Sequence, residues 1–247
     1  MSRADDGMRE IVLIRHAQSE WNLQNRSTGW ADVELTPGGV FEARQAGRRL
    51  AAAGRGFDVV YTSLLKRSRH TARLLLESLG TADLPMYANW RLNERHYGAL
   101  EGLNKDGTQA KYGPDQFQRW RRGYADRPPA LASGDERCPV HKGYAAAVPA
   151  YAFPRTESLA DTEARVVPLW DGVIKPQMHA GRRVLVVSHG NTMRALARHI
   201  EGLDVPAVEA LEFPTATPVV YRFDARGRFV ERSCLEGPCD GPVAHAA

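Results

Sequence analysis

Two short apolar runs, each followed by a histidine, constrain the fold of this chain more than any other feature. Ile11–Ile14 leads directly into Arg15-His16, and much later Val184–Val187 leads into Ser188-His189. Unbroken apolar runs of this length are typical of strands that are buried on both faces, as in a parallel sheet covered by helices. We therefore predict two central strands, each with a histidine at its carboxyl end.

The segments after the first run alternate between strand and helix patterns. Thr36 and Pro37 are a good helix start, with a capping hydroxyl followed by proline, and the helix is expected to stop at Gly54. Such alternation predicts an α/β fold with three layers, a mainly parallel sheet with helices on both faces. Further elements are expected as strands at Phe57–Tyr61 and Val219–Phe223, the latter at the sheet edge, and as helices at Leu64–Leu79 (capped by Thr62-Ser63), Asp161–Ile174 and Thr192–Ile200.

Residues 89–158 interrupt this alternation. They are rich in Gly, Pro and Arg, with a helical stretch near Lys111–Tyr124 and a weakly structured run to Arg155. We interpret them as an insertion that caps the sheet edge within a single α/β catalytic domain of residues 1–232. Residues 233–247 contain Gly-Pro pairs and no lysine, and they are predicted to be a flexible C-terminal tail.

Composition excludes several classes of protein. No run approaches the ~18 apolar residues of a membrane span, and the first residues lack the apolar segment of a secretory signal, so we expect a cytoplasmic protein with no membrane contact. Three cysteines, Cys138, Cys234 and Cys239, make no disulfide framework and are predicted to be free thiols. A net charge of +4 does not argue for nucleic acid, but it suits a small anionic substrate.

The two histidines are expected at the edge where open parallel sheets bind ligands, provided that their strands are neighbours. Gly190 lets the backbone approach a ligand closely, and the helix expected from Thr192 directs unpaired N–H groups to the same place. Together with Arg15 and with Arg67, which lies in the first turn of another helix, His16 and His189 would form a positive site for one phosphoryl group. Arginine forks match phosphate oxygens, and a neutral imidazole is the proper nucleophile.

Each of these residues also has a simpler explanation. A single histidine at a strand end can bond only to the backbone, and Arg67 can belong to a solvated helix face, since Lys66, Arg69 and Arg73 lie around it. Spacings of His, Asp or Glu that are typical of metal sites are missing, so no metal is expected.

Longer motifs make the chain recognisable. Arg15–Asn22 reads RHAQSEWN and Trp90–Leu100 reads WRLNERHYGAL, with shorter motifs at 28–30, 62–67, 102–105, 120–122, 157–159 and 188–191. The first resembles the RHG signature of the histidine phosphatase superfamily, which does not separate mutases from phosphatases. The others resemble the branch of 2,3-bisphosphoglycerate-dependent phosphoglycerate mutases. The similarity covers about residues 10–225.

The resemblance implies catalytic roles for five residues. His16 would be the nucleophile that becomes phosphohistidine, with Arg15, Arg67 and His189 around the transferred phosphoryl group. Glu94 would serve the substrate hydroxyl as general acid and base.

The resemblance also implies a set of substrate contacts, several of which come from the insertion. Cationic groups there would hold the carboxylate and the second phosphate of a bisphosphoglycerate. Without the resemblance, an ion pair of Glu94 with Arg91 or Arg95, and a solvated helix face for Arg121 and Arg122, would be the better interpretations. The implied contacts are Ser19, Asn22, Thr28, Gly29, Tyr97, Lys105, Arg121, Arg122, Gly190 and Asn191.

The implied reaction interconverts 3-phosphoglycerate and 2-phosphoglycerate through phosphorylated His16. 2,3-Bisphosphoglycerate would serve as phosphoryl primer and intermediate, without a metal, and the partners would be small phosphorylated three-carbon acids. A homodimer is expected from the family alone. Two rival functions are left open, a histidine phosphatase acting on a small phosphorylated metabolite and a sensor that binds phosphorylated ligands without turnover.

Three departures from the family pattern bear on the balance between mutase and phosphatase activity. Ala17 and Gln18 stand where mutases usually have Gly and Glu, and Ala216 stands where a glycine is common. The tail from Ser233 onward does not resemble the family's tail, which helps to cover the active site. A weaker cover admits water, so we predict more hydrolysis of the bisphosphate than in a typical mutase.

Overall fold

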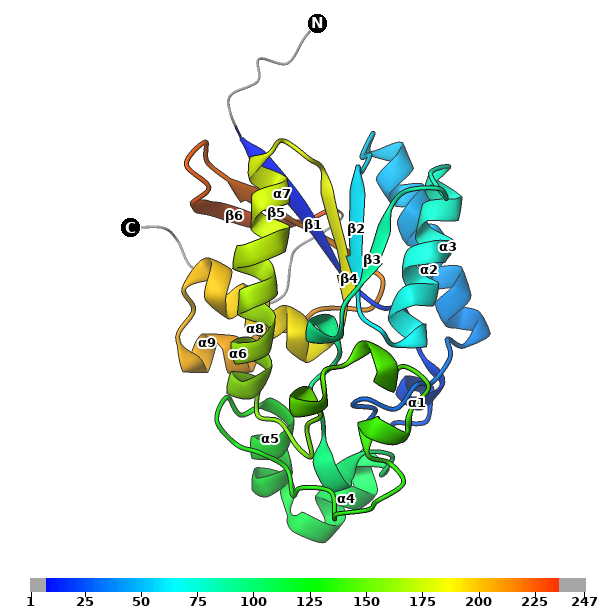
Figure 1. Cartoon of the computed structure of the whole chain (residues 1–247), viewed down its shortest axis with the longest axis vertical. Coiled ribbons are helices and arrows are strands. Elements are labelled where there is room, and N and C mark those ends of the chain that lie inside the picture. The colour runs from blue at the N-terminus through cyan, green and yellow to red at the C-terminus, as the bar shows by residue number, and fades with distance from the viewer. Residues whose placement is uncertain (1–7, 236–247) are drawn as a thin grey trace, which may run out of the picture.

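A mixed sheet forms the centre of the computed structural model, which describes residues 8–235 (Figure 1). In this part of the chain the sheet has six strands in the order β3-β2-β4-β1-β5-β6. The strands β1 to β4 run parallel, whereas β5 and β6 are antiparallel to their neighbours. The strand bounds are β1 Arg9–Arg15, β2 Val59–Thr62, β3 Met86–Ala88, β4 Val184–Ser188, β5 Pro218–Phe223 and β6 Phe229–Cys234.

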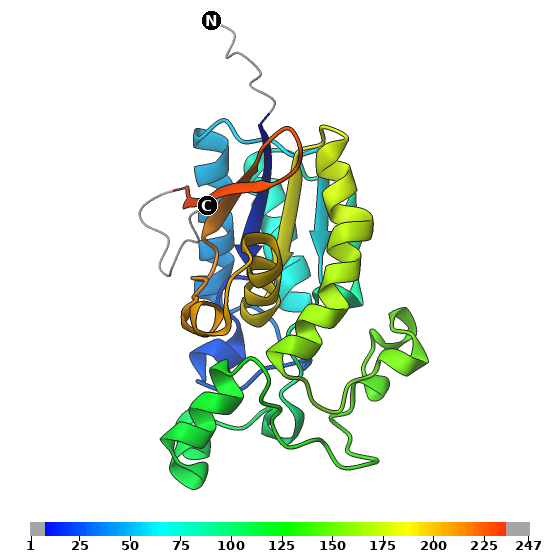
Figure 2. The same ribbon diagram turned by 90° about the vertical axis from the view of Figure 1, so that its left-hand side faces the viewer.

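Helices cover both faces of this sheet, which confirms the predicted three-layer α/β fold (Figure 2). Helices α2 and α3 pack on one face, and α6 and α8 pack on the other. The helix bounds are α1 Glu20–Leu23, α2 Pro37–Ala52, α3 Lys66–Leu79, α4 Lys105–Tyr112, α5 Pro114–Arg122, α6 Leu159–Leu169, α7 Lys175–His179, α8 Gly190–Glu201 and α9 Val205–Ala210.

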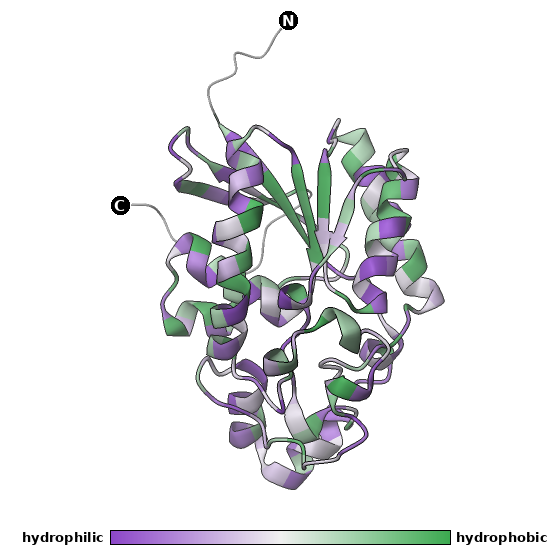
Figure 3. Ribbon diagram, in the orientation of Figure 1, coloured by the Kyte–Doolittle hydropathy of each residue, from purple (hydrophilic) through white to green (hydrophobic). Residues whose placement is uncertain are grey.

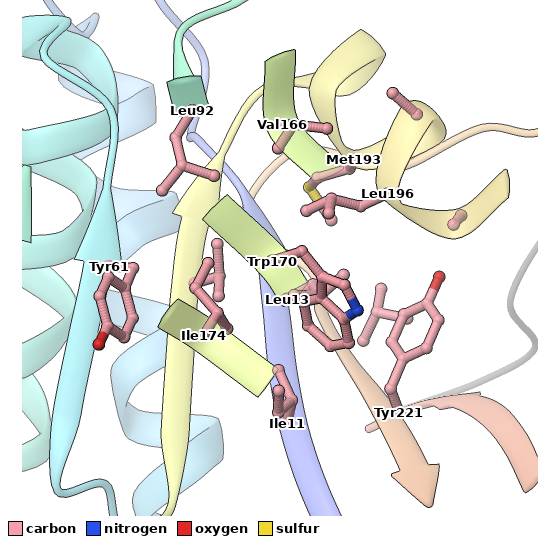
Figure 4. Packing of buried hydrophobic residues seen from close by; sticks show 14 of the residues in the cluster. Ile11, Leu13, Tyr61, Leu92, Val166, Trp170, Ile174, Met193, Leu196 and Tyr221 are labelled. Atoms are coloured by element: carbon pink, nitrogen blue, oxygen red, sulfur yellow. The ribbon is translucent and has the colours of Figure 1, made fainter. Parts of the chain in front are cut away.

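The apolar run of β1 is unbroken because its side chains alternate between two cores. Ile11 and Leu13 belong to the core under α6 and α8, where they lie near Trp170 (Figure 4). Val12 and Ile14 belong to the core under α2 and α3. The central strands are therefore apolar along their length, as Figure 3 shows, and the prediction of strands buried on both faces is confirmed.

Helix α2 begins as predicted, whereas α3 does not. The Thr36 hydroxyl accepts a hydrogen bond from the Gly39 N–H at 2.9 Å, with Pro37 in the first turn. Helix α3 starts at Lys66 rather than Leu64, and Thr62-Ser63 does not cap it.

The two hydroxyls proposed for that cap have other partners. Thr62 Oγ1 lies 2.8 Å from Ser68 Oγ, and Ser63 Oγ lies 2.8 Å from His189 Nε2. Ser68 lies in the first turn of α3, and the Ser63 hydroxyl also accepts from the Leu65 N–H at 3.1 Å. The predicted cap is wrong because both hydroxyls lie beside the helix start without capping its first N–H groups.

Other predicted boundaries also shift. The stretch expected at Lys111–Tyr124 consists of two helices, α4 and α5, because Gly113 between them has a φ of 84°, which a helix does not allow. The helix expected at Asp161–Ile174 is α6 followed by a π-helical turn, Trp170–Ile174, that continues into α7. The helix expected from Thr192 starts two residues earlier, at Gly190.

The C-terminal part of the sheet differs from the prediction. Strand β5 forms as expected, but it is not the edge strand, since β6 pairs with it on the outer side. Strand β6 includes Ser233 and Cys234, so the tail was predicted to begin too early, and residues 236–247 of the predicted flexible tail lie outside the described residues. Cys234 is disulfide-bonded, so the free-thiol prediction is wrong there, whereas Cys138 is a free cysteine.

Residues 89–158 lie mostly at the end of the sheet where β1 and β4 finish (Figure 1). They contribute α4, α5 and several short 3₁₀ turns. This placement brings the charged residues of α4 and α5 opposite the two strand-end histidines. Within residues 8–235, the structure contains no helix with the length and apolar character needed to cross a membrane.

Candidate active site

The two strand-end histidines meet in the structure because their strands are neighbours. Strand β1 pairs with β4 in parallel, with Arg15 opposite Ser188. The His16 N–H donates to the Ser188 carbonyl at 2.8 Å, and the ring centroids of His16 and His189 lie 4.9 Å apart. The condition attached to the sequence prediction is therefore met, and both side chains are buried.

The hydrogen bonds of His16 define which of its nitrogens can react. Nδ1 lies 2.7 Å from the Ala17 carbonyl oxygen, which can only accept, so Nδ1 carries the proton. Arg67 Nε lies 3.3 Å from Nε2 and can only donate, so Nε2 holds the lone pair. His16 lines the cavity, and its nucleophilic atom is therefore Nε2.

His16 is held in the neutral form that a nucleophile requires. Burial lowers its pKa well below the usual value, and the positive charges of Arg67 and Arg15 lower the pKa further. Burial and Arg67 act in the same direction on the pKa of His189.

The Arg67 guanidinium is buried and held in a fixed orientation, so Arg67 is not part of a solvated helix face. Its side chain is fully buried, with Nη1 donating to the Ala31 carbonyl and Nη2 donating to the Gly29 carbonyl, both at 2.8 Å. Gly29 has a φ of +55°, and a Cβ there would come within 2.6 Å of Glu101 Oε2. The loop that holds the guanidinium therefore requires glycine at this position.

Two buried nitrogens beside His16 have no hydrogen-bond partner in the described part of the chain. They are Arg15 Nε and His189 Nδ1. The other ends of both side chains are anchored, Arg15 Nη1 to the Phe213 carbonyl at 2.9 Å and His189 Nε2 to Ser63 Oγ at 2.8 Å. A buried unpaired donor costs about 1–3 kcal/mol. A tetrahedral anion beside His16 would relieve that cost, so the residues fit a phosphoryl group.

We call Arg15, His16, Arg67 and His189 the cradle. Glu94 lies at its border, where Oε1 accepts from the Arg95 N–H at 2.8 Å and from the Asn191 N–H at 3.2 Å. Among the ion pairs of residues 8–235, none joins Glu94 to Arg91 or Arg95, so the ion-pair explanation is not supported. The carboxylate lines the cavity, as a group that exchanges protons with a substrate must.

A second group of cations faces the cradle across the same cavity. Lys105 at the start of α4 and Arg121 and Arg122 at the end of α5 form what we call the cap wall. Burial, and after it the positive charge of Arg121, lower the pKa of Arg122 to about 10. Crowded cations of this kind repel each other, and a bound anion would relieve that repulsion.

Most of the predicted substrate contacts lie on the cavity wall. Ser19 does not: it is fully buried, caps α1, and its hydroxyl lies 2.9 Å from Asn22 Oδ1. We therefore assign Ser19 to orienting Asn22 rather than to direct contact. The predicted residues that line the cavity are Arg15, His16, Asn22, Thr28, Gly29, Arg67, Glu94, Tyr97, Lys105, Arg121, Arg122, Gly190 and Asn191.

The cavity also contains residues that the sequence prediction missed. They are Arg26, Ser27, Arg194, Glu212 and Phe213. Arg194 could have been found, because it lies four residues after Gly190 on one helix and so faces the same side. Glu212 carries no such signal, because its place depends on how α9 packs.

The departures near the nucleophile have different consequences. Ala17 is not among the described residues with positive φ, so its Cβ causes no backbone strain. The Gln18 Oε1 accepts from the Thr36 hydroxyl at 2.8 Å and thereby connects the loop after His16 to the start of α2. Ala216, in contrast, has a φ of 49° and is strained.

The part of the chain that the structure describes shows no cluster of side chains that could bind a metal ion. Residues 8–235 contain no group of three or more His, Cys, Asp or Glu side chains arranged to hold an ion.

Comparison with known proteins places this site in a family. The model of the histidine phosphatase superfamily (branch 1) matches residues 11–139 and 135–235. The chain is 50% identical over 220 residues to the 2,3-bisphosphoglycerate-dependent phosphoglycerate mutase of Treponema pallidum (strain Nichols), covering 87% of this chain and 88% of the relative. It is 47% identical over 218 residues to the protein of the same name from Hamiltonella defensa subsp. Acyrthosiphon pisum (strain 5AT), covering 88% of each.

Solved structures support the fold. The structure described as mycobacterial hydrolase 1 superposes with a TM-score of 0.68 at 23% identity, covering 95% of this chain and all of that one. The phosphoglycerate mutase from Bacillus anthracis str. Sterne gives a TM-score of 0.63 at 20% identity, covering 91% of this chain and 92% of that one. The chain belongs to the histidine phosphatase superfamily, in agreement with its fold and cradle. Within that superfamily, the chain belongs to the family of 2,3-bisphosphoglycerate-dependent phosphoglycerate mutases.

Proposed function

We propose that this protein interconverts 3-phosphoglycerate and 2-phosphoglycerate through a phosphohistidine at position 16. The observation that carries the proposal is the cavity with a cation group on each side. The cradle offers a neutral nucleophile and two unpartnered nitrogens for one phosphoryl group, and the cap wall offers separate cations for a second anionic group. The family membership of the chain supports the same reaction.

The cradle residues and Glu94 would each have a defined role in the phosphoryl transfer. Bound 2,3-bisphosphoglycerate supplies the phosphoryl group that primes the enzyme. His16 Nε2 forms the bond to phosphorus as the bond from phosphorus to the substrate oxygen breaks, and Glu94 gives a proton to that oxygen. In reverse, Glu94 takes a hydroxyl proton while His16 returns the phosphoryl group. Arg67, Arg15 and His189 stabilise the charge on the phosphoryl oxygens throughout.

Phosphorus NMR of 3-phosphoglycerate, with and without catalytic 2,3-bisphosphoglycerate, tests this function. Isomerisation that depends on the bisphosphate, with little free phosphate, is the expected result. Free phosphate as the main product would show a histidine phosphatase that uses the same nucleophile. The variant His16→Ala is the matched control and should abolish both products.

Labelling distinguishes a catalyst from a protein that only binds phosphorylated ligands. After mixing with bisphosphoglycerate, the enzyme should carry an acid-labile phosphoryl group that is missing in His16→Ala. An unlabelled wild-type protein would point to a sensor. Under the proposed function, the substrates are small phosphorylated three-carbon acids. A cytoplasmic location and a homodimer remain part of the proposal as family expectations.

A further inference from the structure

A carboxylate that is not among the predicted catalytic or substrate-binding residues forms an ion pair with one of the cap-wall cations. Glu212 lines the cavity and forms an ion pair with Arg122, between Oε1 and Nη2. Most charged residues on the cavity wall are cations, and Glu94 and Glu212 are the acidic ones among the lining residues that the structure describes. Glu94 accepts from backbone N–H groups, whereas Glu212 neutralises an arginine that faces the ligand space.

The backbone around Glu212 directs its side chain toward the cavity. Helix α9 ends at Ala210, and Leu211 continues in an extended conformation. Leu211 and Phe213 are buried, at 0% and 3% exposure, while the Glu212 side chain is 50% exposed. Because successive side chains of an extended segment alternate, the two anchored neighbours leave Glu212 on the open side.

Hydrogen bonds tie the backbone of Arg122, the partner of Glu212, to α9. Arg194 Nη2 donates both to the Arg122 carbonyl at 2.9 Å and to the Val208 carbonyl at 2.8 Å, so one guanidinium connects the end of α5 to α9. The Tyr124 N–H donates to Glu209 Oε1 at 2.9 Å and joins the same two segments. The Arg122 side chain is 16% exposed. These bonds hold the backbone of Arg122 beside α9, so its guanidinium lies within reach of the Glu212 carboxylate.

We propose that Glu212 is a specificity-determining residue whose carboxylate competes with the second anionic group of the ligand for Arg122. A ligand that reaches the cap wall must displace Glu212 from Arg122, and its anionic group is repelled by the Glu212 carboxylate. This repulsion is larger for a doubly phosphorylated ligand than for a small anion in the cradle. Glu212 therefore weakens binding of bisphosphorylated ligands selectively. The identity of the ligand rests on the proposed function, but the competition at Arg122 does not require turnover.

Calorimetry on the full-length chain tests the competition directly. Glu212→Gln removes the charge and keeps the size of the side chain. Glu77→Gln is the matched control, because its side chain is exposed on α3 and does not line the cavity. Each substitution is placed in a His16→Ala background, so that 2,3-bisphosphoglycerate binds without transferring its phosphoryl group. Inorganic phosphate serves as the probe that carries one anionic group and cannot reach the cradle and the cap wall together.

Glu212→Gln should bind 2,3-bisphosphoglycerate about tenfold more tightly, a gain of about 1.4 kcal/mol, while phosphate affinity changes less than about twofold. Glu77→Gln should leave both affinities unchanged. Unchanged or weaker binding of the bisphosphate in Glu212→Gln would overturn the proposal, and so would an equal gain for phosphate. These outcomes are separate from failure of the proposed function, which would appear as missing isomerisation in the NMR experiment.

Discussion

The cradle and the cap wall bind anions by different structural means. The cradle lies at the ends of β1 and β4 and at the start of α3, and its His16 and Arg67 are held by hydrogen bonds to backbone carbonyls. The cap wall lies on two short helices of the insertion, and its Arg121 is exposed. The reacting group is thus placed at the buried end of the sheet, where its geometry is fixed, whereas the cations for a second anionic group lie on more exposed helices of the insertion.

The largest effect of a cation should come from the cradle. Arg67→Met removes a donor to the transferred phosphoryl group, and kcat should fall about 10²–10³-fold, as for loss of a transition-state donor. Arg69→Met, on the exposed side of the same helix, is the control and should leave steady-state kinetics unchanged. Melting temperatures of both variants separate loss of catalysis from loss of folding, and Arg67→Lys should recover part of kcat. A kcat within tenfold of wild type in Arg67→Met would contradict the assignment of the chemical step to the cradle.

The support beneath the cradle should be sensitive to pH. The Trp30 N–H donates at 2.9 Å to Glu101 Oε2, in the loop whose carbonyls hold Arg67. Burial raises the pKa of Glu101 from 4.5 to about 7. With the folded pKa above the unfolded one, the stability that this carboxyl contributes is complete below pH 4.5 and is lost as the pH rises through 7.

Glu101→Gln cannot ionise and should therefore be more stable than wild type in alkaline solution. From the size of the pKa shift we expect a gain of about 2–3 kcal/mol in the free energy of unfolding near pH ~8.5 and almost none near pH ~5. Urea denaturation at the two pH values measures it, with the exposed Glu136→Gln as control. An equal effect of Glu101→Gln at both pH values would show that ionisation of this carboxyl does not limit the stability of the loop.

A cap-wall substitution should act on binding more than on the chemical step. Arg121→Gln removes a cavity cation that the proposed function assigns to the far end of the substrate, so KM should rise about tenfold, or about 1.4 kcal/mol, with kcat within about threefold. Arg119→Gln, exposed on the same helix, is the control. Initial rates over a range of 3-phosphoglycerate concentrations give both constants. A hundredfold loss of kcat would mean that the cap wall also stabilises the transition state.

The smallest expected effect concerns backbone strain behind the cradle. The Ala216 N–H donates to the Arg15 carbonyl at 2.9 Å while its own φ is 49°. A left-handed conformation costs an L-residue about 1–2 kcal/mol, partly offset by the entropy of glycine, so Ala216→Gly should stabilise the fold by about 1 kcal/mol without changing kcat. Ala17→Gly, where φ is not positive, should instead destabilise. Urea midpoints that move in the same direction for both would contradict this explanation.

Local patterns predicted the cradle better than the cap wall. The strand-end positions of His16 and His189 followed from two apolar runs, because a strand buried on both faces requires an unbroken run. The roles of Lys105, Arg121 and Arg122 came only from the family resemblance, since charges on short polar helices look alike whether they face solvent or a ligand. The edge strands β3 and β6 were missed because they are short or carry polar side chains.

The sequence by itself determined the three-layer fold, the central strands and the residues that end them, since burial on both faces is encoded within a few consecutive positions. Tertiary structure alone decided which carbonyl groups hold Arg67, that Ser63 bonds to His189, and how Glu212 reaches Arg122. These contacts join segments far apart in the chain, so they depend on packing geometry that no local pattern records.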